Sequence, residues 1–262
     1  MSRREKRNSN ALITILILII AFASAVLGYS IVKILSVKFE MDDVLEVQDD
    51  TKMQTEKSDD VWSYMSGYYA LAGQNSDFAG WIRFDSDLVN LPFMRRGDDF
   101  YLKHNFNKDY SSSGTVYMNG NQSLESRNIT LYGHYVYAND KAMFSPLDKL
   151  RRVENYEANK VFRLYLKNEI RTYHVAAVVQ YSVNSDWMFD APDYSEEEWL
   201  SFLKYAQTHA LYETSEAVSD NANYVTLQTC IRGSDTLRTV ILGKEVERIF
   251  NEKTVKSTDQ RD

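Results

Sequence analysis

The sequence predicts a mostly-β domain, a closed or nearly closed β-barrel with a few helices, preceded by one transmembrane helix. From Gly80 onward, short runs rich in β-branched and aromatic residues alternate with clusters of Gly, Asn, Asp and Ser, a pattern typical of strands joined by turns. Aromatic residues make up 13% of the 262 residues, and such residues pack well on pleated sheets. Near the N-terminus lies one long apolar run without charges.

The apolar run spans residues 11–32. As an α-helix it would extend over roughly 33 Å, which is enough to cross a bilayer. Basic residues are more numerous before it than just after it: Arg3, Arg4, Lys6 and Arg7 precede the run, and Lys33 and Lys38 follow. The positive-inside rule therefore predicts a single-pass protein of the cell membrane, with its N-terminus in the cytoplasm and the rest outside.

A cleaved signal peptide is the alternative to an anchor. The small residues Ala21, Ala23 and Ala25 would suit a cleavage site after a short apolar core. The apolar character continues to Val32, however, which is further than a signal peptide requires and favours an uncleaved anchor. Either way, we expect the body of the protein to be exported.

Composition divides the chain into five segments. Residues 41–60 are strongly acidic and lack a sustained apolar face, which favours a stalk. The last residues are polar, and chain ends of this kind are often frayed. We expect a cytoplasmic N-terminus at 1–10, a transmembrane anchor at 11–32, an acidic stalk at 33–60, a folded domain at 61–250 and a disordered tail at 251–262.

The folded domain is expected to begin with a helix, because apolar residues recur at helical spacing from Val61 to Ala72. One later helix is also expected: Ser195 and Glu198 form a capping box, and an apolar stripe follows at Trp199, Phe202, Leu203 and Ala206. Strands are predicted at 81–84, 115–118, 129–132, 161–166, 170–183, 224–229 and 237–246. The strands at 161–166 and 170–183 meet at Asn168 and Glu169, which indicates a hairpin.

Charge and cysteine content exclude some function classes. The net charge of −7 argues against a nucleic-acid partner, because phosphate binding needs clustered Lys and Arg. No cluster of carboxylates suggests a calcium site, and we expect neither a metal nor a cofactor. Cys230 is the only cysteine, so an exported domain has no partner within the chain for a disulfide. A lone cysteine is buried and inert, paired with another molecule, or reactive.

The position of Cys230 favours the reactive alternative. It ends the run Thr226-Leu227-Gln228-Thr229-Cys230, and a polar turn follows, so the thiol lies at a strand end where a substrate has access. A free thiol with a pKa near 8.5 is only about 3% thiolate at pH 7, and it needs a base or a positive neighbour.

Among the four histidines, His134 is the best candidate for that base. It follows the apolar run Leu131-Tyr132-Gly133, which places the imidazole at another strand terminus. His104 lies near a transition from strand to loop, His174 in the middle of a strand and His209 at the end of the capped helix. We expect His174 and His209 to be scaffold residues.

Acyl transfer also needs donors for the oxyanion of the tetrahedral intermediate, and an arginine fork can supply them. Arg232 and Arg238 both follow Cys230. If the polar turn reverses the chain, a residue early in the returning strand lies beside one late in the outgoing strand. Arg238 fits that geometry, whereas Arg232 would lie on the turn itself.

The motifs together resemble those of the sortases, the cysteine transpeptidases of Gram-positive bacteria, whose usual signature is TLxTC. Several segments are similar to class B sortases in particular, and the resemblance extends from about residue 60 to residue 247. The segments are TLQTC at 226–230 with Arg238 on the next strand, LYGH at 131–134, GWIRF at 80–84 with Leu91-Pro92, YLKHNF at 101–106, SSGTVY at 112–117 and the helix from Ser195.

This resemblance implies an eight-stranded sortase barrel with N-terminal helices and a helix between the sixth and seventh strands. It implies that Cys230 is the nucleophile, His134 the catalytic histidine and Arg238 the catalytic arginine. The implied reaction cleaves a C-terminal sorting signal after Thr through a thioacyl-enzyme and passes the protein to an amine of a peptidoglycan precursor of the lipid II type. His104 matches no catalytic position.

Two departures from the class B pattern concern substrate preference. The residue two before the cysteine is often serine in class B sortases, and here it is Gln228; the histidine is commonly followed by Asn-Met, and here Tyr135 follows. We expect four residues around these positions to contact the substrate: Leu227, Gln228, Thr229 and Tyr135.

Two other functions remain open at this stage. A pilus-associated sortase would join pilins through a lysine amine by the same chemistry, and neighbouring genes would distinguish it. A non-catalytic anchored β-barrel that binds a partner would leave Cys230 inert, and a thiol-reactive probe would distinguish that one.

Overall fold

The computed structural model describes residues 14–32, 35, 62–137, 139–187 and 189–251. The chain divides into two units, Met1–Asp42 and Asp43–Asp262. In the first unit, the helix Thr14–Val32 has a mean hydropathy of 2.6 and is long and apolar enough to cross a membrane. This helix coincides with most of the predicted anchor. The predicted stalk at 33–60 and tail at 251–262 lie outside the described residues, apart from Leu35 and Asn251.

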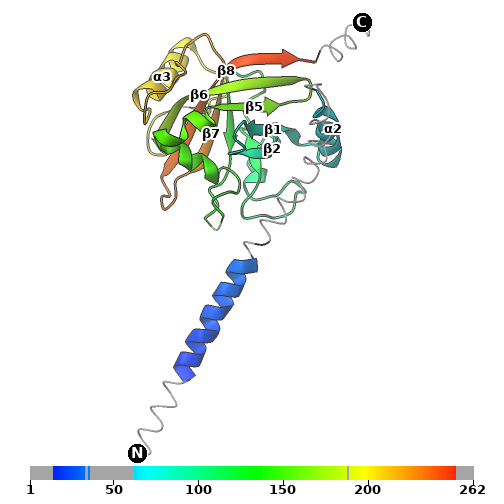
Figure 1. The fold of residues 1–262 in the computed structure, drawn as a ribbon, viewed down its shortest axis with the longest axis vertical. Helices are drawn as coiled ribbons and strands as arrows, with labels where there is room; N and C mark the ends of the chain where they lie inside the picture. The colour runs from blue at the N-terminus through cyan, green and yellow to red at the C-terminus, as the bar shows by residue number, and fades with distance from the viewer. Residues whose placement is uncertain (1–13, 33–34, 36–61, 138, 188, 252–262) are drawn as a thin grey trace, which may run out of the picture. The chain divides into compact units, whose positions relative to one another are not determined.

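The second unit is built around a closed barrel of eight strands (Figure 1). The strands are β1 (Phe78–Phe84), β2 (Asn90–Met94), β3 (Val116–Met118), β4 (Asn128–Tyr132), β5 (Val161–Tyr165), β6 (Glu169–Ser182), β7 (Tyr224–Cys230) and β8 (Leu237–Phe250). Around the barrel they follow the order β1-β2-β3-β4-β7-β8-β6-β5. The pairs β2–β3 and β4–β7 are parallel, and the other neighbours are antiparallel. The predicted mostly-β barrel is confirmed.

Strand β2 is the one strand that the residue pattern alone did not predict. Its sequence, Asn90-Leu-Pro-Phe-Met94, contains Pro92, which has no N–H to donate to a sheet. The structure accommodates Pro92 because pairing with β3 begins only at the next residue, Phe93. On its other side, Pro92 is the Cα partner of Trp81 in β1.

Two α-helices pack on the barrel. Helix α2 (Met65–Gln74) begins a few residues later than the predicted start. Helix α3 (Glu196–Thr208) lies between β6 and β7 in the chain and has the predicted capping box, in which the Ser195 side chain accepts from the Glu198 N–H and the Glu198 carboxylate accepts from the Ser195 N–H. The predicted apolar stripe is buried against β6 and β8.

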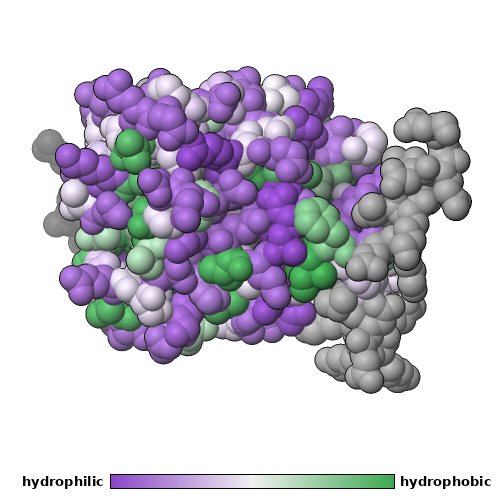
Figure 2. All heavy atoms as spheres, turned by 90° about the horizontal axis from the view of Figure 1, so that it is seen from above, coloured by the Kyte–Doolittle hydropathy of each residue, from purple (hydrophilic) through white to green (hydrophobic). Residues whose placement is uncertain are grey.

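Short 3-10 helices complete the domain: η1 (Phe100–Leu102), η2 (Ser145–Arg151), η3 (Val153–Asn155) and η4 (Glu157–Asn159). Helix η2 contacts β6, β7 and β8 and carries the fully buried Leu147 and Leu150. Seen from above, the visible face of the protein is mostly hydrophilic, with apolar residues in small separate patches (Figure 2).

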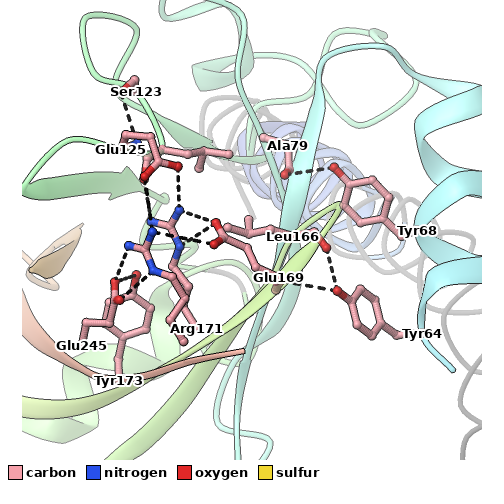
Figure 3. Close-up of polar contacts among 12 residues, drawn as sticks. Tyr64, Tyr68, Ala79, Ser123, Glu125, Leu166, Glu169, Arg171, Tyr173 and Glu245 are labelled. Carbon is pink, nitrogen blue, oxygen red and sulfur yellow. Dashed lines mark hydrogen bonds and ion pairs between the residues drawn. The ribbon is translucent and has the colours of Figure 1, made fainter. Parts of the chain in front are cut away.

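A partly buried ionic network holds one end of the long β6–β8 ladder (Figure 3). Arg171, whose side chain is 1% exposed, pairs with Glu169 and Glu125 and donates to the Leu124 carbonyl. Arg248, its Cα partner on β8, pairs with Glu125 and Glu245. Because a buried charge is costly unless it is paired, this network fixes the β3–β4 connection on the barrel. Cys230 lies beside the other end of β8, where Arg238 is the partner of Tyr181.

Candidate active site

The β7–β8 pairing places Arg238 directly beside Cys230. The two residues are Cα partners, and the polar turn between them reverses the chain as expected. The Ile231 N–H donates to the Leu237 carbonyl at 3.1 Å, so the adjacent pair is the hydrogen-bonded one and Cys230–Arg238 is a non-hydrogen-bonded pair. In such pairs the Cα atoms are about 4.5 Å apart and the two side chains project from the same face of the sheet. Arg232 lies on the turn, outside both strands.

The β4–β7 pairing brings His134 to the same position from the other side. These strands are parallel, with Tyr132 opposite Gln228, and the Gly133 N–H continues the ladder by donating to the Gln228 carbonyl at 3.1 Å. Two more residues at the same offset bring His134 level with Cys230. His134, two residues beyond the end of β4, therefore lies in a row with Cys230 on β7 and Arg238 on β8.

Within this row the three side chains do not bond to one another. His134 Nε2 lies 2.7 Å from the Leu102 carbonyl oxygen. Arg238 Nη1 donates to the carbonyls of Asp235 and Leu237, each at 3.0 Å. Cys230 is a free thiol of intermediate exposure. Among the residues that the structure describes, no hydrogen bond joins Cys230 to either partner, so the thiol is left open to a substrate.

The residues predicted to contact substrate fall on two sides of the sheet. Gln228 and Cys230 alternate with Leu227 and Thr229 along β7, and only the first two are partly exposed. Leu227 is 0% exposed and Thr229 is 1% exposed, so both side chains face the barrel interior. Tyr135 is partly exposed, and its ring lies 5.4 Å from that of Tyr137. Gln228 and Tyr135 are therefore the two of the four whose side chains a substrate can reach.

The segment between β6 and β7 adds a wall on the Cys230 side of the sheet. The Phe189 carbonyl accepts hydrogen bonds from Asn128 and Thr130 on β4, at 2.6 and 3.0 Å. Two residues closer to His134, the Tyr132 hydroxyl donates to Asp190 at 2.9 Å. Burial, followed by the negative charge of Asp190, raises the pKa of Tyr132, which keeps its hydroxyl protonated. The Tyr132–Asp190 pair could not be predicted from sequence, because the two residues lie far apart in the chain.

A small pocket of about 190 Å³ lies beyond Tyr135. It is lined by Tyr135, Asp140, Ser145, Asp148, Lys149, Arg152 and Asn155. Asp148 accepts a hydrogen bond from the Thr239 hydroxyl at 3.0 Å, and Thr239 follows Arg238 on β8. The pocket therefore lies close to the row at two points. Tyr135, which lines it, follows His134 in the chain, and Asp148, which also lines it, is bonded to the residue that follows Arg238.

The other three histidines make contacts outside the row of His134, Cys230 and Arg238. His174, on β6, contacts Glu216 at 3.2 Å, and His209 follows α3 and contacts the Tyr205 carbonyl at 3.0 Å. His104 is stacked on Phe100, with ring centroids 3.7 Å apart. Among the described residues, no group of three or more His, Cys, Asp or Glu side chains is arranged to hold a metal ion.

Comparison with known proteins gives one relative and several solved structures. No family model matches the chain. Sortase B of Staphylococcus aureus is 23% identical over 179 residues, which cover 66% of this chain and 72% of the relative.

The solved structures share the barrel. Clostridium perfringens sortase B superposes with a TM-score of 0.63 at 26% identity, covering 69% of this chain and 100% of that one. A Bacillus anthracis protein described as similar to sortase B gives 0.61 at 29% identity, with 69% and 82% covered. Staphylococcus aureus sortase B gives 0.69 at 21% identity, with 79% and 98% covered. Sequence and fold thus both identify this chain as a homologue of sortase B, and that homology supports a transpeptidase of the sortase type.

Proposed function

We propose that this protein is a class B-like sortase in which Cys230 cleaves a C-terminal sorting signal after Thr and transfers the protein to an amine of the peptidoglycan cross-bridge. The observation that carries the proposal is the row of His134, just beyond the end of β4, with Cys230 on β7 and Arg238 on β8. A nucleophile, an acid–base group and an oxyanion donor are the three groups that acyl transfer through a thioester needs.

In the first half of the reaction, the Cys230 thiolate attacks the carbonyl carbon of the Thr–Gly or Thr–Asn bond. The S–C bond forms, the C–N bond breaks, and His134 gives its proton to the leaving amine. In the second half, the acceptor amine attacks the thioester, His134 takes the proton from that amine, and the thiolate leaves. The acceptor bond replaces the bond that was broken, so no oxidant or cofactor is needed.

Arg238 has donors available for this chemistry. A guanidinium carries five N–H donors. Only Nη1 is bound, to the Asp235 and Leu237 carbonyls, so the Nε and Nη2 donors have no partner among the described residues. We assign these donors to the oxyanion and to the substrate backbone, which suits the fork geometry of arginine.

The proposed substrate groove lies on the Cys230 face of β4, β7 and β8. Gln228 and Tyr135 contact the peptide through their side chains. The side chains of Leu227 and Thr229 are buried, so these two residues do not contact the peptide through their side chains; they hold the backbone of β7 that carries Gln228 and Cys230. Tyr132 and Asp190 form the groove wall beside Gln228.

The same proposal places the protein in the cell membrane. The uncharged helix Thr14–Val32 is the anchor, preceded by a cytoplasmic N-terminus at 1–10 and followed by a stalk, with the catalytic domain at 61–250 outside the cell. This order suits an enzyme whose partners are surface proteins and a membrane-bound peptidoglycan precursor. Among the similar structures, one is a Staphylococcus aureus sortase B–substrate complex, which supports a peptide groove in this barrel.

A transfer assay tests the proposal. The full chain in detergent is incubated with a panel of sorting-signal peptides and with two competing amines, a cross-bridge peptide and a lysine-containing pilin peptide. We expect cleavage after Thr and transfer to the cross-bridge peptide. Preferential transfer to the pilin lysine would replace cell-wall anchoring with pilin polymerisation, and transfer by the Cys230→Ala variant would refute the mechanism.

A further inference from the structure

Two motifs that the proposed chemistry leaves unexplained meet at the imidazole of His134. The first is the segment Tyr101–Phe106, which includes the end of η1. The second is the turn at 111–115 before β3. The Leu102 carbonyl, the last of η1, lies 2.7 Å from His134 Nε2. A carbonyl oxygen only accepts hydrogen bonds, so this contact requires a proton on Nε2.

Gly114 lies against that carbonyl. Its φ is +58°, in the left-handed region, and a Cβ on this residue would stand 2.6 Å from the Leu102 oxygen and 2.4 Å from the Tyr101 oxygen. Real Cβ atoms do not approach backbone oxygens so closely, so the turn adopts this position only with glycine. The next residue stabilises this packing, because the Thr115 N–H donates to the Tyr101 carbonyl at 2.9 Å.

Further hydrogen bonds hold η1 and the residues just after it in place. The Tyr101 side chain is 1% exposed, accepts from Asn75 at 2.9 Å and donates to Asp77 at 2.9 Å. The Thr115 hydroxyl donates to the His104 carbonyl at 3.0 Å. With η1 fixed on both sides, the direction of the Leu102 carbonyl is fixed as well.

We infer that Gly114 is a positioning residue for His134. It lets the turn at 111–115 pack on η1, which aims the Leu102 carbonyl at Nε2 and keeps a proton on that nitrogen. Nδ1 is then the nitrogen that exchanges a proton with Cys230 and the substrate amines. The assignment of Nδ1 to catalysis rests on the proposed sortase function. The tautomer and its dependence on Gly114 do not.

The tautomer is measured directly by ¹⁵N NMR of the imidazole nitrogens in the full chain in detergent, labelled only at its four histidines. We expect neutral His134 to carry its proton on Nε2. His104 is an internal comparison of the opposite kind: its Nδ1 lies 2.7 Å from the Phe100 carbonyl, so the same reasoning predicts its proton on Nδ1. Signals are assigned by replacing one histidine at a time. A proton on Nδ1 of His134 overturns the inference.

Gly114→Ala tests the positioning, with Gly97→Ala as its matched control. Gly97 also has a positive φ, +93°, but a Cβ there meets nothing within 4 Å. Both variants carry the strain of a left-handed alanine, and only one displaces the Leu102 carbonyl. We expect Gly114→Ala to give a mixture of His134 tautomers and to lower transfer by about 10²-fold, mainly in kcat, as for a misplaced catalytic group. Gly97→Ala should retain both the tautomer and the rate.

The outcomes separate this inference from the proposed function. If Gly114→Ala keeps the Nε2 proton and the wild-type rate, or if Gly97→Ala disturbs both equally, Gly114 does not act through Leu102. If Gly114→Ala does not fold, the tautomer of the wild-type protein decides. If the tautomer is as expected but no peptide is transferred, the proposed function fails and the positioning remains.

Discussion

Replacing Arg238 is expected to remove the oxyanion donors while leaving the barrel intact. Arg238 is the non-hydrogen-bonded partner of Cys230, and its Nε and Nη2 donors have no partner among the described residues. The loss of one oxyanion donor raises a barrier by about 2.7–4 kcal/mol, which corresponds to about 10²–10³-fold in kcat. Arg238→Ala removes at least one such donor, so we expect kcat to fall by at least about 10²-fold.

Two further variants isolate the cause. Arg238→Lys keeps the positive charge but loses the planar fork, so most of the loss in kcat should remain. Arg232→Ala removes a cation from the nearby turn without removing a partner of Cys230, and its effect should be several-fold at most.

The assay is steady-state transfer of a sorting-signal peptide to an amine, with kcat and KM determined separately and with circular dichroism to verify folding. The reasoning is refuted if Arg238→Ala retains more than about a tenth of the wild-type kcat, well above the loss that one donor predicts. It is also refuted if Arg232→Ala proves the more damaging change.

Three other expectations follow from the structure. A thiol-reactive methanethiosulfonate probe should label native Cys230, and His134→Ala should slow that labelling; no labelling of the folded protein would favour an inert thiol. Arg171→Met breaks a buried ion pair and should cost about 3 kcal/mol and lower Tm by roughly 6–12 °C, whereas Arg163→Met, at an exposed pair, should cost at most about 1 kcal/mol. Equal Tm values would contradict the network. Burial alone would raise the pKa of Glu216, but hydrogen bonds from Lys244 and His174 outweigh it and hold the pKa below its ordinary value of 4.5. A carboxyl with a depressed folded-state pKa stabilises above the unfolded pKa and loses that contribution as pH falls, so Glu216→Gln should flatten the stability–pH curve below about pH 4.5. If urea unfolding of Glu216→Gln shows the same loss of stability below about pH 4.5 as the wild-type protein, the hydrogen bonds to Glu216 do not make this contribution.

The strands and the chemistry of β7 and β8 were predictable because they depend on local pattern. A strand, a polar turn and a returning strand lie next to one another in the chain, so the pairing of Cys230 with Arg238 follows from a simple reversal. The capping box of α3 is equally local. The residue pattern placed His134 at a strand end, but its approach to Cys230 depends on the parallel pairing of β4 with β7, two strands far apart in sequence, and only the resemblance to sortases indicated that the two residues meet.

Some of what was missed had a signal. Side chains alternate along a strand, so Leu227 and Thr229 were bound to face away from Cys230, and their prediction as substrate contacts overlooked this period. Other features had none. Pro92 makes the sequence of β2 unlike that of a strand. The contact of Gly114 with the Leu102 carbonyl arises from packing between two loops. Neither hydropathy nor spacing encodes such a contact.

The central claim is that Cys230 carries the acyl group between two peptides. Its most direct test is intact-protein mass spectrometry of the full chain mixed with a sorting-signal peptide in the absence of an amine, followed by mapping of the modified residue. The account predicts an adduct with the mass of the peptide fragment ending in Thr, located on Cys230, removed when an amine is added, and absent from Cys230→Ala. Peptide cleavage without any adduct on Cys230, or an adduct on another residue, would contradict it.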